Sequence, residues 1–215
     1  MTDQLKTRRE REKQARYEAI LDAAEGVFSE KGYERTSMDD IARRASLSRA
    51  LLYVYFKDKA AIQHGITLRA AANLRERMEK AAAGADTGLA QAAAIGQAYY
   101  EFYREEPEYF SALTQANAAP VTPDEEQAAR MRCSESAIME LMIETIKRGL
   151  ADGSLNSERI RDPMETALYL RGALHGVIMG CGREIDGAFA RFPSEALIEH
   201  TLAMLMSSIA GKSTP

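Results

Sequence analysis

The sequence predicts an all-α protein, and three observations support this fold class. Apolar residues recur at spacings of three and four along most of the chain, which is the period of one helix face. A capping residue, a first-turn proline and an acid recur together at residues 122–125 and again at Asp162, Pro163 and Glu165. No stretch alternates apolar and polar residues and no Asn-Gly pair occurs, so a sheet is not expected.

Composition narrows the class of protein further. The 215 residues are 46% hydrophobic and 28% charged, which is ordinary for a globular protein. No long run is wholly apolar and the charged N-terminus lacks an apolar signal segment, so we expect a cytoplasmic protein without a membrane span. Cys133 and Cys181 stand far apart without a Cys-x-x-Cys pair, so no metal, disulfide framework or cofactor is expected.

Charge is distributed unevenly along the chain. The net charge is -4, but residues 1–57 hold twelve Lys and Arg against ten Asp and Glu, whereas residues 58–215 hold sixteen against twenty-two. A basic end on an acidic body is typical of a protein that meets phosphate at one end. We therefore expect a first domain over residues 1–57 that contacts nucleic acid, and a second domain over residues 58–215.

The first segment, residues 1–12, is polar and lacks an apolar stripe, so we expect it to be disordered or frayed. Its arginines could enter a DNA minor groove, or the segment could be a solubilising tail. The first firm helix is expected over residues 13–31, and Gly32 is placed to end it in a left-handed cap. The buried stripe of this helix is expected to be Tyr17, Ile20, Leu21, Ala24, Val27 and Phe28.

Residues 36–59 predict two short helices and the start of a third. Ser37 and Asp40 form a capping box, after which Met38, Ile41, Ala42 and Ala45 share one face. Ser46 to Ser48 interrupt the pattern, and Ser48 can cap a second helix over residues 49–56. Leu52 and Phe56 share its buried side.

Two short helices joined in this way resemble a helix-turn-helix, whose second helix enters the DNA major groove. The outward residues of that helix are Arg49, Ala50, Tyr53 and Val54. Arg49 could read guanine or hold a phosphate, and the hydroxyls of Tyr53 and Tyr55 could reach phosphates. The remaining cations are Arg43, Arg44, Lys57 and Lys59. A solvated helix face with packed tyrosines would have the same composition.

Residues 15–62 resemble the signature of the tetracycline-repressor (TetR) family. The residues that carry the resemblance are Ala24, Phe28, Gly32, Tyr33, Thr36, Ser37, Met38, Ile41, Ala42, Leu47, Ser48, Leu52, Tyr53, Phe56 and Lys59. The resemblance implies a homodimeric, all-helical transcriptional regulator: a three-helix DNA-binding domain, then a helical ligand-binding and dimerisation domain. It also implies a double-stranded, pseudo-palindromic DNA operator and a small-molecule effector that loosens DNA binding.

The same resemblance implies roles for individual positions and shows three departures. It places Arg49, Ala50, Leu51 and Tyr53 among the recognition-helix contacts, Tyr55 and Lys59 among the phosphate contacts, and Asp39 near the start of the first short helix. The usual glycine of the turn is Ser46 here, which positive φ would strain. The other departures are Ala50-Leu51 before Leu52-Tyr53 and Val54-Tyr55 after Tyr53, and they leave the preferred DNA sequence open.

Beyond residue 57 the pattern stays helical. Asp58 is placed to cap a long helix through residue 83, which would join the two domains and act as a lever. Ile62, Ile66, Ala70 and Leu74 form its apolar side, while residues 69–80 alternate charge like a solvated face. Further helices are expected over residues 89–104, from 107, and over 122–153, 163–181 and 194–209, with a loop at 117–121.

The last two helices are expected to pair with a second copy of the chain. Gly172, Gly176 and Gly180 stand four residues apart, and each glycine costs about 1 kcal/mol relative to alanine inside a helix. A small-residue ridge would let another helix approach closely, although close packing within one subunit would also explain it. The predicted interface is Leu170, Ala173, Leu174, Val177, Leu197, Thr201, Leu205 and Ser208.

The second domain is rich in Met and aromatic residues, which suit a pocket for a bulky, mostly hydrophobic ligand. The candidate contacts are Tyr99, Phe102, Tyr103, Phe110, Met139, Met142, Tyr169 and His175. Core packing would explain the same residues, and a histidine among apolar neighbours can be hydrogen-bonded in the core.

The sequence therefore favours a ligand-responsive DNA-binding regulator that acts as a repressor. Two other classes are weighed against it. A DNA-architectural protein without an effector would make the large acidic body superfluous. An enzyme is disfavoured because the three histidines come without HExxH, GxSxG or a phosphate loop.

Overall fold

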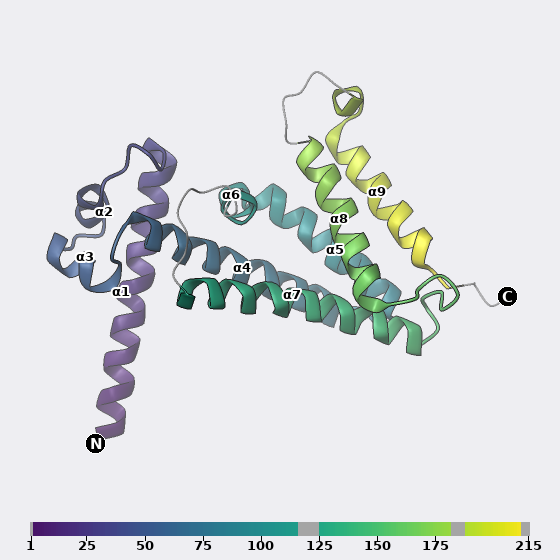
Figure 1. The fold of residues 1–215 in the computed structure, drawn as a ribbon, viewed down its shortest axis with the longest axis horizontal. Helices are drawn as coiled ribbons and strands as arrows, with labels where there is room; N and C mark the ends of the chain where they lie inside the picture. Colours follow the sequence, from purple (N-terminus) through teal and green to yellow (C-terminus); the bar gives the residue numbers. More distant parts are fainter. Residues whose placement is uncertain (1, 116–124, 182–187, 212–215) are drawn as a thin grey trace. The chain divides into compact units, whose positions relative to one another are not determined.

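The structure is a computed structural model that describes residues 2–115, 125–181 and 188–211 (Figure 1). Over these residues the chain is helical, and the only bridge of the β type is an isolated antiparallel pair, Leu155 with Ala210. The all-α prediction is confirmed. The helices are α1 (Thr2–Lys31), α2 (Met38–Arg44), α3 (Arg49–Tyr55), α4 (Lys59–Ala83), α5 (Gly88–Glu105), α6 (Pro107–Gln115), α7 (Glu125–Ala151), α8 (Pro163–Cys181) and α9 (Ser194–Ile209), with a short 3-10 helix, η2 (Ala188–Arg191), before α9.

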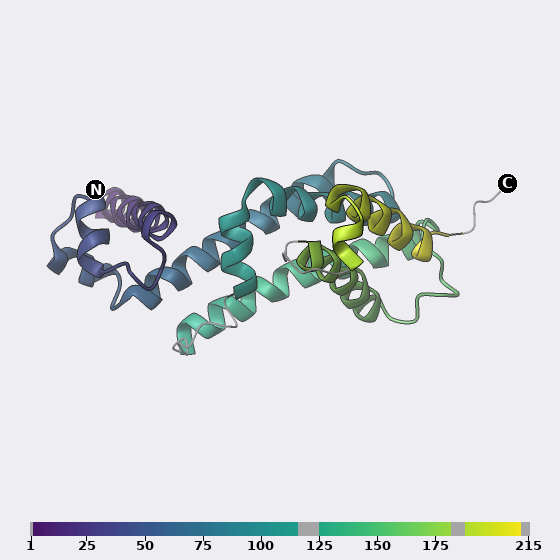
Figure 2. The ribbon, with the colours of Figure 1, turned by 90° about the horizontal axis from the view of Figure 1, so that it is seen from above.

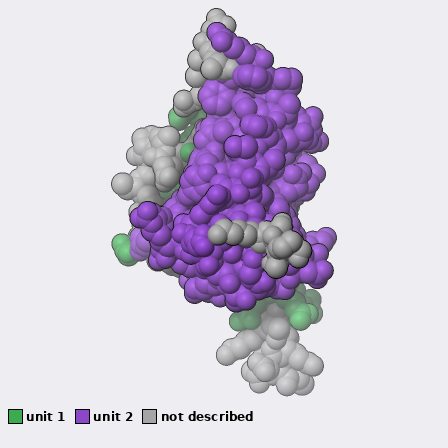
Figure 3. All heavy atoms as spheres, turned by 90° about the vertical axis from the view of Figure 1, so that its right-hand side faces the viewer, with its two compact units in different colours: residues 1–70, 108–130 green, residues 71–107, 131–215 purple. Residues whose placement is uncertain are grey.

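The chain forms two compact units, which are coloured separately in Figure 3. Unit 1 comprises residues 1–70 and 108–130, and unit 2 comprises residues 71–107 and 131–215. Helix α4 contributes its first half to unit 1 and its second half to unit 2. Helix α6 belongs to unit 1 apart from its first residue, so unit 1 contains more than the N-terminal helices.

The core of unit 1 joins α1, α2, α3, the start of α4 and α6. Its buried members are Ile20, Leu21, Ala24, Ile41, Ala42, Leu52, Phe56, Ile62, Ile66 and Ala112. The ring of Tyr17 stacks on Phe56, with 4.8 Å between the ring centroids. The amphipathic stripes predicted for the first four helices therefore converge on one core.

Helix α1 is longer than predicted, and the expectation that residues 1–12 lack structure was wrong. The helix begins at Thr2, and every side chain described from Arg8 to Arg16 is exposed. Side-chain pairs one turn apart support it: Arg8 contacts Glu12 at 2.8 Å, and Gln14 donates to Glu18 at 2.5 Å. A helix can therefore continue here without an apolar stripe, because local pairs and helix-forming residues sustain it.

The prediction that residues 69–80 of α4 form a solvated face was wrong for Arg69, whose side chain is mostly buried. Only 19% of its side chain is exposed, and its guanidinium donates to Asp22 at 2.6 Å and to Glu18 at 2.7 Å. It also contacts Glu25, to which the Tyr109 hydroxyl donates at 3.5 Å. Burial raises the pKa of the Glu25 carboxyl, and Arg69 opposes that shift. This cluster connects α1, α4 and α6 within unit 1.

In unit 2, α8 lies along α9, and α5 packs against both, as Figure 1 and Figure 2 show from two directions. The start of α5 approaches the end of α7 so closely that a Cβ on Gly88 would lie 2.2 Å from the backbone of Gly149. Asp152 and Ser154 accept hydrogen bonds from the first backbone amides of α5, at 2.8 and 3.0 Å. These glycines thus permit a contact that no larger residue would allow.

The predicted helix caps are confirmed where the structure describes them. Asp58 accepts from the backbone N–H of Ala61 at 2.7 Å, and Asp162 accepts from Met164 and Glu165 at 2.7 and 3.0 Å. The predicted loop at 117–121 and the cap at Thr122 lie outside the described residues. Among the helices that are described, none combines the length and apolar character needed to cross a membrane.

Candidate nucleic-acid interface and ligand-binding region

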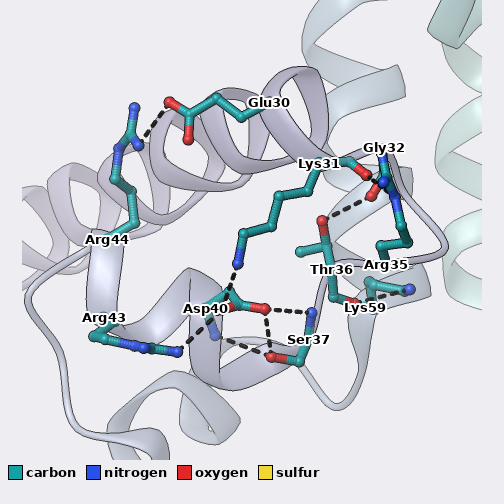
Figure 4. A network of polar contacts seen from close by, with 10 residues as sticks. All are labelled: Glu30, Lys31, Gly32, Arg35, Thr36, Ser37, Asp40, Arg43, Arg44 and Lys59. Carbon is teal, nitrogen blue, oxygen red and sulfur yellow. Dashed lines mark hydrogen bonds and ion pairs between the residues drawn. The ribbon is translucent and has the colours of Figure 1, made fainter.

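Helix α2 is held at its start by a cluster of polar contacts around Asp40 (Figure 4). The Asp40 carboxylate accepts from the Ser37 backbone N–H at 3.1 Å and from the Ser37 hydroxyl at 2.7 Å. Lys31 at the end of α1 donates to it at 2.8 Å, and Arg43 at 3.0 Å. Lys31 and Ser37 together hold the pKa of Asp40 well below its ordinary value. The predicted capping box is confirmed, and it also ties α2 to α1.

The turn between α2 and α3 places Ser46 in the left-handed region, with φ of 56°. The backbone N–H of Leu47 then donates to the carbonyl of Ala42 at 2.9 Å, which closes the end of α2. A serine in this region is strained by roughly 1 kcal/mol because its Cβ crowds the following carbonyl. The strain predicted from the missing glycine is therefore present.

Helix α3 presents its predicted faces. The Ser48 hydroxyl accepts from the Leu51 N–H at 3.2 Å and caps the helix, while Leu52 and Phe56 are buried. On the opposite side Tyr53 is 42% and Val54 is 75% exposed, with Arg49 and Ala50 also exposed. Leu51 and Tyr55 are half-buried, and Tyr55 packs against the core of unit 1.

Arg49 is the centre of the exposed surface formed by α2 and α3. Its guanidinium contacts the Asp39 carboxylate at 3.3 Å and lies 5.6 Å from the centroid of the Tyr53 ring. Both neighbours raise the pKa of Arg49, Tyr53 more than Asp39. Three of the predicted contact residues, one from α2 and two from α3, therefore form one group that faces solvent.

The other predicted cations differ in what surrounds them. Arg43 and Arg44 are exposed, although Arg43 contacts Asp40 and Arg44 contacts Glu30 at 2.9 Å. Lys57 is exposed at the end of the α3 segment. Such exposed pairs are worth little, about 0 to 1 kcal/mol, so a phosphate could replace the acidic partner at small cost.

Lys59 differs from these residues because its side chain turns into the protein. Its ammonium group donates to the backbone carbonyls of Tyr33 at 2.5 Å, Glu34 at 3.3 Å and Thr36 at 3.0 Å. It also lies 4.2 Å from the centroid of the Tyr33 ring. The sequence marked Lys59 as a cation beside α3, and the family resemblance placed it among the phosphate contacts. The inward position of its side chain was not predicted, because a cage of backbone carbonyls leaves no pattern in residue types.

Helices α8 and α9 bury, within unit 2, part of the face that was predicted for an interface. Leu170, Leu174 and Leu205 are buried and contribute to the core of unit 2. The other predicted interface residues, Ala173, Val177, Leu197, Thr201 and Ser208, are half-buried.

The exposed side of α8 carries the small and apolar residues instead. Gly172 and Gly176 are exposed, and an added Cβ would meet nothing within 4 Å at either position. Leu168 and Tyr169 lie on the same helix with about half of their surface exposed, as does Met204 of α9. Gly180 differs from the other glycines because the ring of Phe189 in η2 packs directly on it.

Among the predicted ligand contacts, Tyr99 of α5 and His175 of α8 meet inside unit 2. The Tyr99 oxygen lies 2.7 Å from His175 Nδ1. Burial raises the pKa of the Tyr99 hydroxyl and lowers that of the His175 imidazole, so the pair is neutral at pH 7. Arg171 is close enough to oppose the shift at Tyr99 and to add to the one at His175, and a neutral hydroxyl–imidazole pair of this kind can orient one polar atom of a ligand.

The remaining predicted ligand contacts are scattered. Phe102 and Met142 are buried and Tyr103 and Met139 are half-buried, all in unit 2. Tyr169 of α8 is 51% exposed, in contrast to the buried Phe102 and Met142. Phe110 is buried but belongs to unit 1. No three His, Cys, Asp or Glu side chains of the described residues form a group that could hold a metal ion.

A core of short crossed helices that exposes an arginine-bearing second helix defines a helix-turn-helix DNA-binding protein. Two family models match the chain and identify the family of DNA-binding proteins to which it belongs. Residues 20–64 match the bacterial regulatory proteins of the tetR family, and residues 92–205 match the tetracyclin repressor-like C-terminal domain. The second match alone covers more than half of the chain, so the protein belongs to the TetR family of transcriptional regulators.

Curated relatives are similar over parts of their length. The chain is 43% identical over 58 residues to the A-factor receptor protein of Streptomyces griseus, covering 25% of this chain and 21% of the relative. It is 24% identical over 142 residues to the transcriptional activator FasR of Mycolicibacterium smegmatis, covering 66% and 62%. It is 46% identical over 43 residues to IcaR of Staphylococcus aureus, a negative regulator of the biofilm operon, covering 20% and 23%.

Solved structures share the fold over most of the chain. A TetR/AcrR family regulator from Thermobifida fusca has a TM-score of 0.72 at 24% identity, covering 89% of this chain and 97% of that one. FadR from Bacillus subtilis, solved with stearoyl-CoA, has a TM-score of 0.69 at 19% identity, covering 90% and 99%. SmeT, the repressor of a multidrug efflux pump of Stenotrophomonas maltophilia, has a TM-score of 0.68 at 21% identity, covering 92% and 91%.

Proposed function

We propose that the protein is a homodimeric, sequence-specific DNA-binding repressor that a small, mostly hydrophobic effector releases from its operator. The observation that carries the proposal is the exposed group of Arg49, Asp39 and Tyr53 on a helix-turn-helix whose core is fully packed. Residues 1–57 supply the DNA-reading surface, and residues 58–215 supply ligand binding and dimerisation.

The DNA partner is a double-stranded operator. Arg49 lies in the first turn of α3, where a recognition helix meets base edges, and its fork of donors suits guanine O6 and N7. The proposed phosphate contacts are Arg43 and Arg44 of α2, Tyr55 of α3 and Lys57, which follows α3. Two copies related by a two-fold axis require a pseudo-palindromic site.

The second copy binds the outer side of α8 and the adjoining part of α9. Gly172 and Gly176 leave open space on that side, and Leu168 and Met204 leave apolar surface there. Side chains from the partner would occupy that space and cover the apolar surface, which repays the helix propensity lost at two glycines. The interface proposed from the sequence is thereby moved around α8, from its buried side to its exposed side.

The effector is proposed to bind in unit 2 near Tyr99 and His175. Phe102, which is buried, and Tyr103, which is half-buried, follow Tyr99 by three and four positions on α5 and so share its side of the helix, which favours a bulky apolar ligand with one hydroxyl or carbonyl oxygen. The effector would act by population shift, because it releases DNA only as far as it prefers the conformation that binds DNA poorly. Curated relatives include both an activator and a negative regulator of transcription. Whether this protein represses its target is therefore tested with a reporter gene.

DNA binding is tested by selecting duplexes from a random pool with the full-length protein. The most enriched sequence, the selected duplex, is then titrated by fluorescence anisotropy at several salt concentrations. We expect specific binding whose log affinity falls linearly with log salt concentration. A pool without enriched sequences, or salt-independent binding, would contradict the proposal. A reporter driven by the selected site should rise when the gene for this protein is deleted, as repression requires.

Effector binding is tested by thermal shift with free stearate, stearoyl-CoA and uncharged amphiphiles as probes. A probe that raises the melting temperature should also release the selected duplex. Tyr99→Phe should weaken both responses, whereas Tyr100→Phe, a matched change at the next residue of α5, should leave them unchanged. Equal effects of the two variants would place the ligand elsewhere.

A further inference from the structure

We propose that Lys59 is a positioning residue that fixes the recognition helix, and that it makes no contact with DNA phosphate. The proposal rests on the DNA binding proposed above and assigns a different role to one of its expected contacts. The geometry of the ammonium group carries it. Three backbone carbonyls, those of Tyr33, Glu34 and Thr36, lie within hydrogen-bond distance of the Lys59 nitrogen.

An ammonium group has three protons, and the three carbonyls can accept all of them. The aromatic face of Tyr33 at 4.2 Å adds a further attraction for the cation. The side chain is half-buried, in contrast to the exposed Lys57 two residues earlier. A phosphate contact would require Lys59 to give up hydrogen bonds that are already made inside the protein.

The position of Lys59 in the chain shows why a cation there needs these acceptors. Lys59 is the first residue of α4, where the positive end of the helix dipole disfavours a cation. The carbonyls that receive it belong to the turn after α1, beyond the last hydrogen-bonded turn of that helix. The lysine therefore satisfies backbone acceptors of one element from the start of another.

The same hydrogen bonds link the segment that precedes α2 to the segment that follows α3. Thr36 directly precedes Ser37, which caps α2, and Lys59 follows Phe56, which ends α3, by three residues. Lys59 thus ties the beginning of α2 to the end of α3 and the beginning of α4. With both ends held, α3 has one orientation relative to α2, which is the condition for Arg49 to reach a base edge.

The functional consequence is that loss of Lys59 should weaken sequence-specific binding while leaving the electrostatic attraction to DNA intact. A phosphate contact would show the opposite signature. Its removal would weaken binding to every sequence and would reduce the slope of log affinity against log salt by about 0.9. Affinity for the selected duplex, affinity for a shuffled duplex and salt dependence together separate the two roles.

The experiment compares Lys59→Met and Lys59→Arg with the wild-type protein. Arginine keeps the charge but presents planar donors spread over three nitrogens, which cannot aim three protons from one atom at the carbonyls of Tyr33, Glu34 and Thr36. We expect both variants to lose roughly ten-fold in affinity for the selected duplex, the size of one lost base contact. Their affinity for a shuffled duplex and their salt slope should stay at the wild-type values.

Two controls separate positioning from loss of charge and from loss of stability. Lys57→Met removes the charge of an exposed lysine close by, and it calibrates the effect of charge on the slope. Ile41→Val destabilises the same core without touching the carbonyls around Lys59. Circular dichroism at the assay temperature confirms that each variant is folded, and Ile41→Val should retain the specific affinity that the Lys59 variants lose.

Wild-type affinity in Lys59→Arg, together with a flatter salt slope in Lys59→Met, would overturn the proposal and make Lys59 a phosphate contact. Equal proportional losses on both duplexes in the Lys59 variants would also overturn it. Neither result would affect the proposed function, which fails separately if the wild-type protein selects no sequence at all.

Discussion

The pair α2 and α3 and the pair α8 and α9 show how differently a sequence constrains two helical regions. In α2 the apolar residues occupy one side, and the predicted inward residues Ile41 and Ala42 are buried, as is Leu52 of α3. In α8 the apolar residues occupy both sides, with Leu174 buried and Leu168 about half exposed. The sequence of a helix with one apolar side predicts which side is buried. In a helix that is apolar all round, the side that is buried depends on which other helices pack against it.

The sharpest test of this comparison is within α8. Leu174→Ala should lower the free energy of unfolding by about 2 to 5 kcal/mol, because it leaves a cavity in the core of unit 2. Urea unfolding followed by circular dichroism measures the change. Leu168→Glu is the matched change on the exposed side and should leave unit 2 folded.

Self-association separates the two sides further. Light scattering at micromolar concentration should find a dimer for the wild-type protein and a monomer for Leu168→Glu, because a buried carboxylate without a partner opposes association. If Leu168→Glu unfolds as Leu174→Ala does, the two sides of α8 have been assigned wrongly. A monomeric wild-type protein would remove the proposed interface altogether.

In the first pair of helices, the largest effect is expected on binding and not on stability. Arg49→Ala should cost about 1 to 3 kcal/mol of affinity for the selected duplex if Arg49 reads a base. Fluorescence anisotropy measures the loss, and thermal melting should be unchanged because the side chain is exposed. Arg75→Ala removes the same charge from α4 in unit 2. An equal loss of affinity for the selected duplex in Arg75→Ala would show that Arg49 contributes only nonspecific electrostatic attraction.

A smaller effect should come from the strained turn between α2 and α3. Ser46→Gly should raise the free energy of unfolding by about 0.5 to 1 kcal/mol, because glycine adopts positive φ without a steric penalty. Chemical denaturation provides the measurement. Ala45→Gly is the control, since its φ of -76° needs no glycine and the change should destabilise. Stabilisation by Ala45→Gly, or none by Ser46→Gly, would contradict strain at Ser46.

The smallest expected effect is the pH dependence of the Asp40 cluster. Because the folded state lowers the pKa of Asp40, its ionised form stabilises the fold above the ordinary pKa of aspartate, and that contribution is lost as the pH falls through the folded value. Asp40→Asn should therefore melt lower than the wild type at neutral pH, and the gap should narrow in acid. A gap that is constant with pH would show that the charge of Asp40 is immaterial.

Local patterns predicted much of the candidate site. Ser37, Ser48 and Asp58 were identified as caps because capping depends on residues three positions apart, and Arg49 and Tyr53 were placed outward by helical period alone. Local patterns also located the cap at Gly32, where φ is 79°, whereas the left-handed turn at Ser46 was expected from the resemblance to the TetR family. The resemblance to the TetR family supplied what periodicity does not, namely which exposed helix reads DNA.

Other features required the folded chain. The inward turn of the Lys59 side chain depends on carbonyls that lie 23 to 26 residues earlier in the sequence. The burial of Arg69 against Glu18 and Asp22 joins residues about 50 positions apart, and a charged stretch of α4 therefore looked solvated in the sequence. Long-range contacts of this kind are set by which helices pack together.

The sequence by itself determined the helices, their caps and the helix-turn-helix, because these depend on residues within about one turn of each other. Only the tertiary structure decided which side of α8 is buried, where the Lys59 ammonium donates and that Tyr99 meets His175. Each of these depends on surfaces brought together from distant parts of the chain, and a residue's type does not specify its distant neighbours.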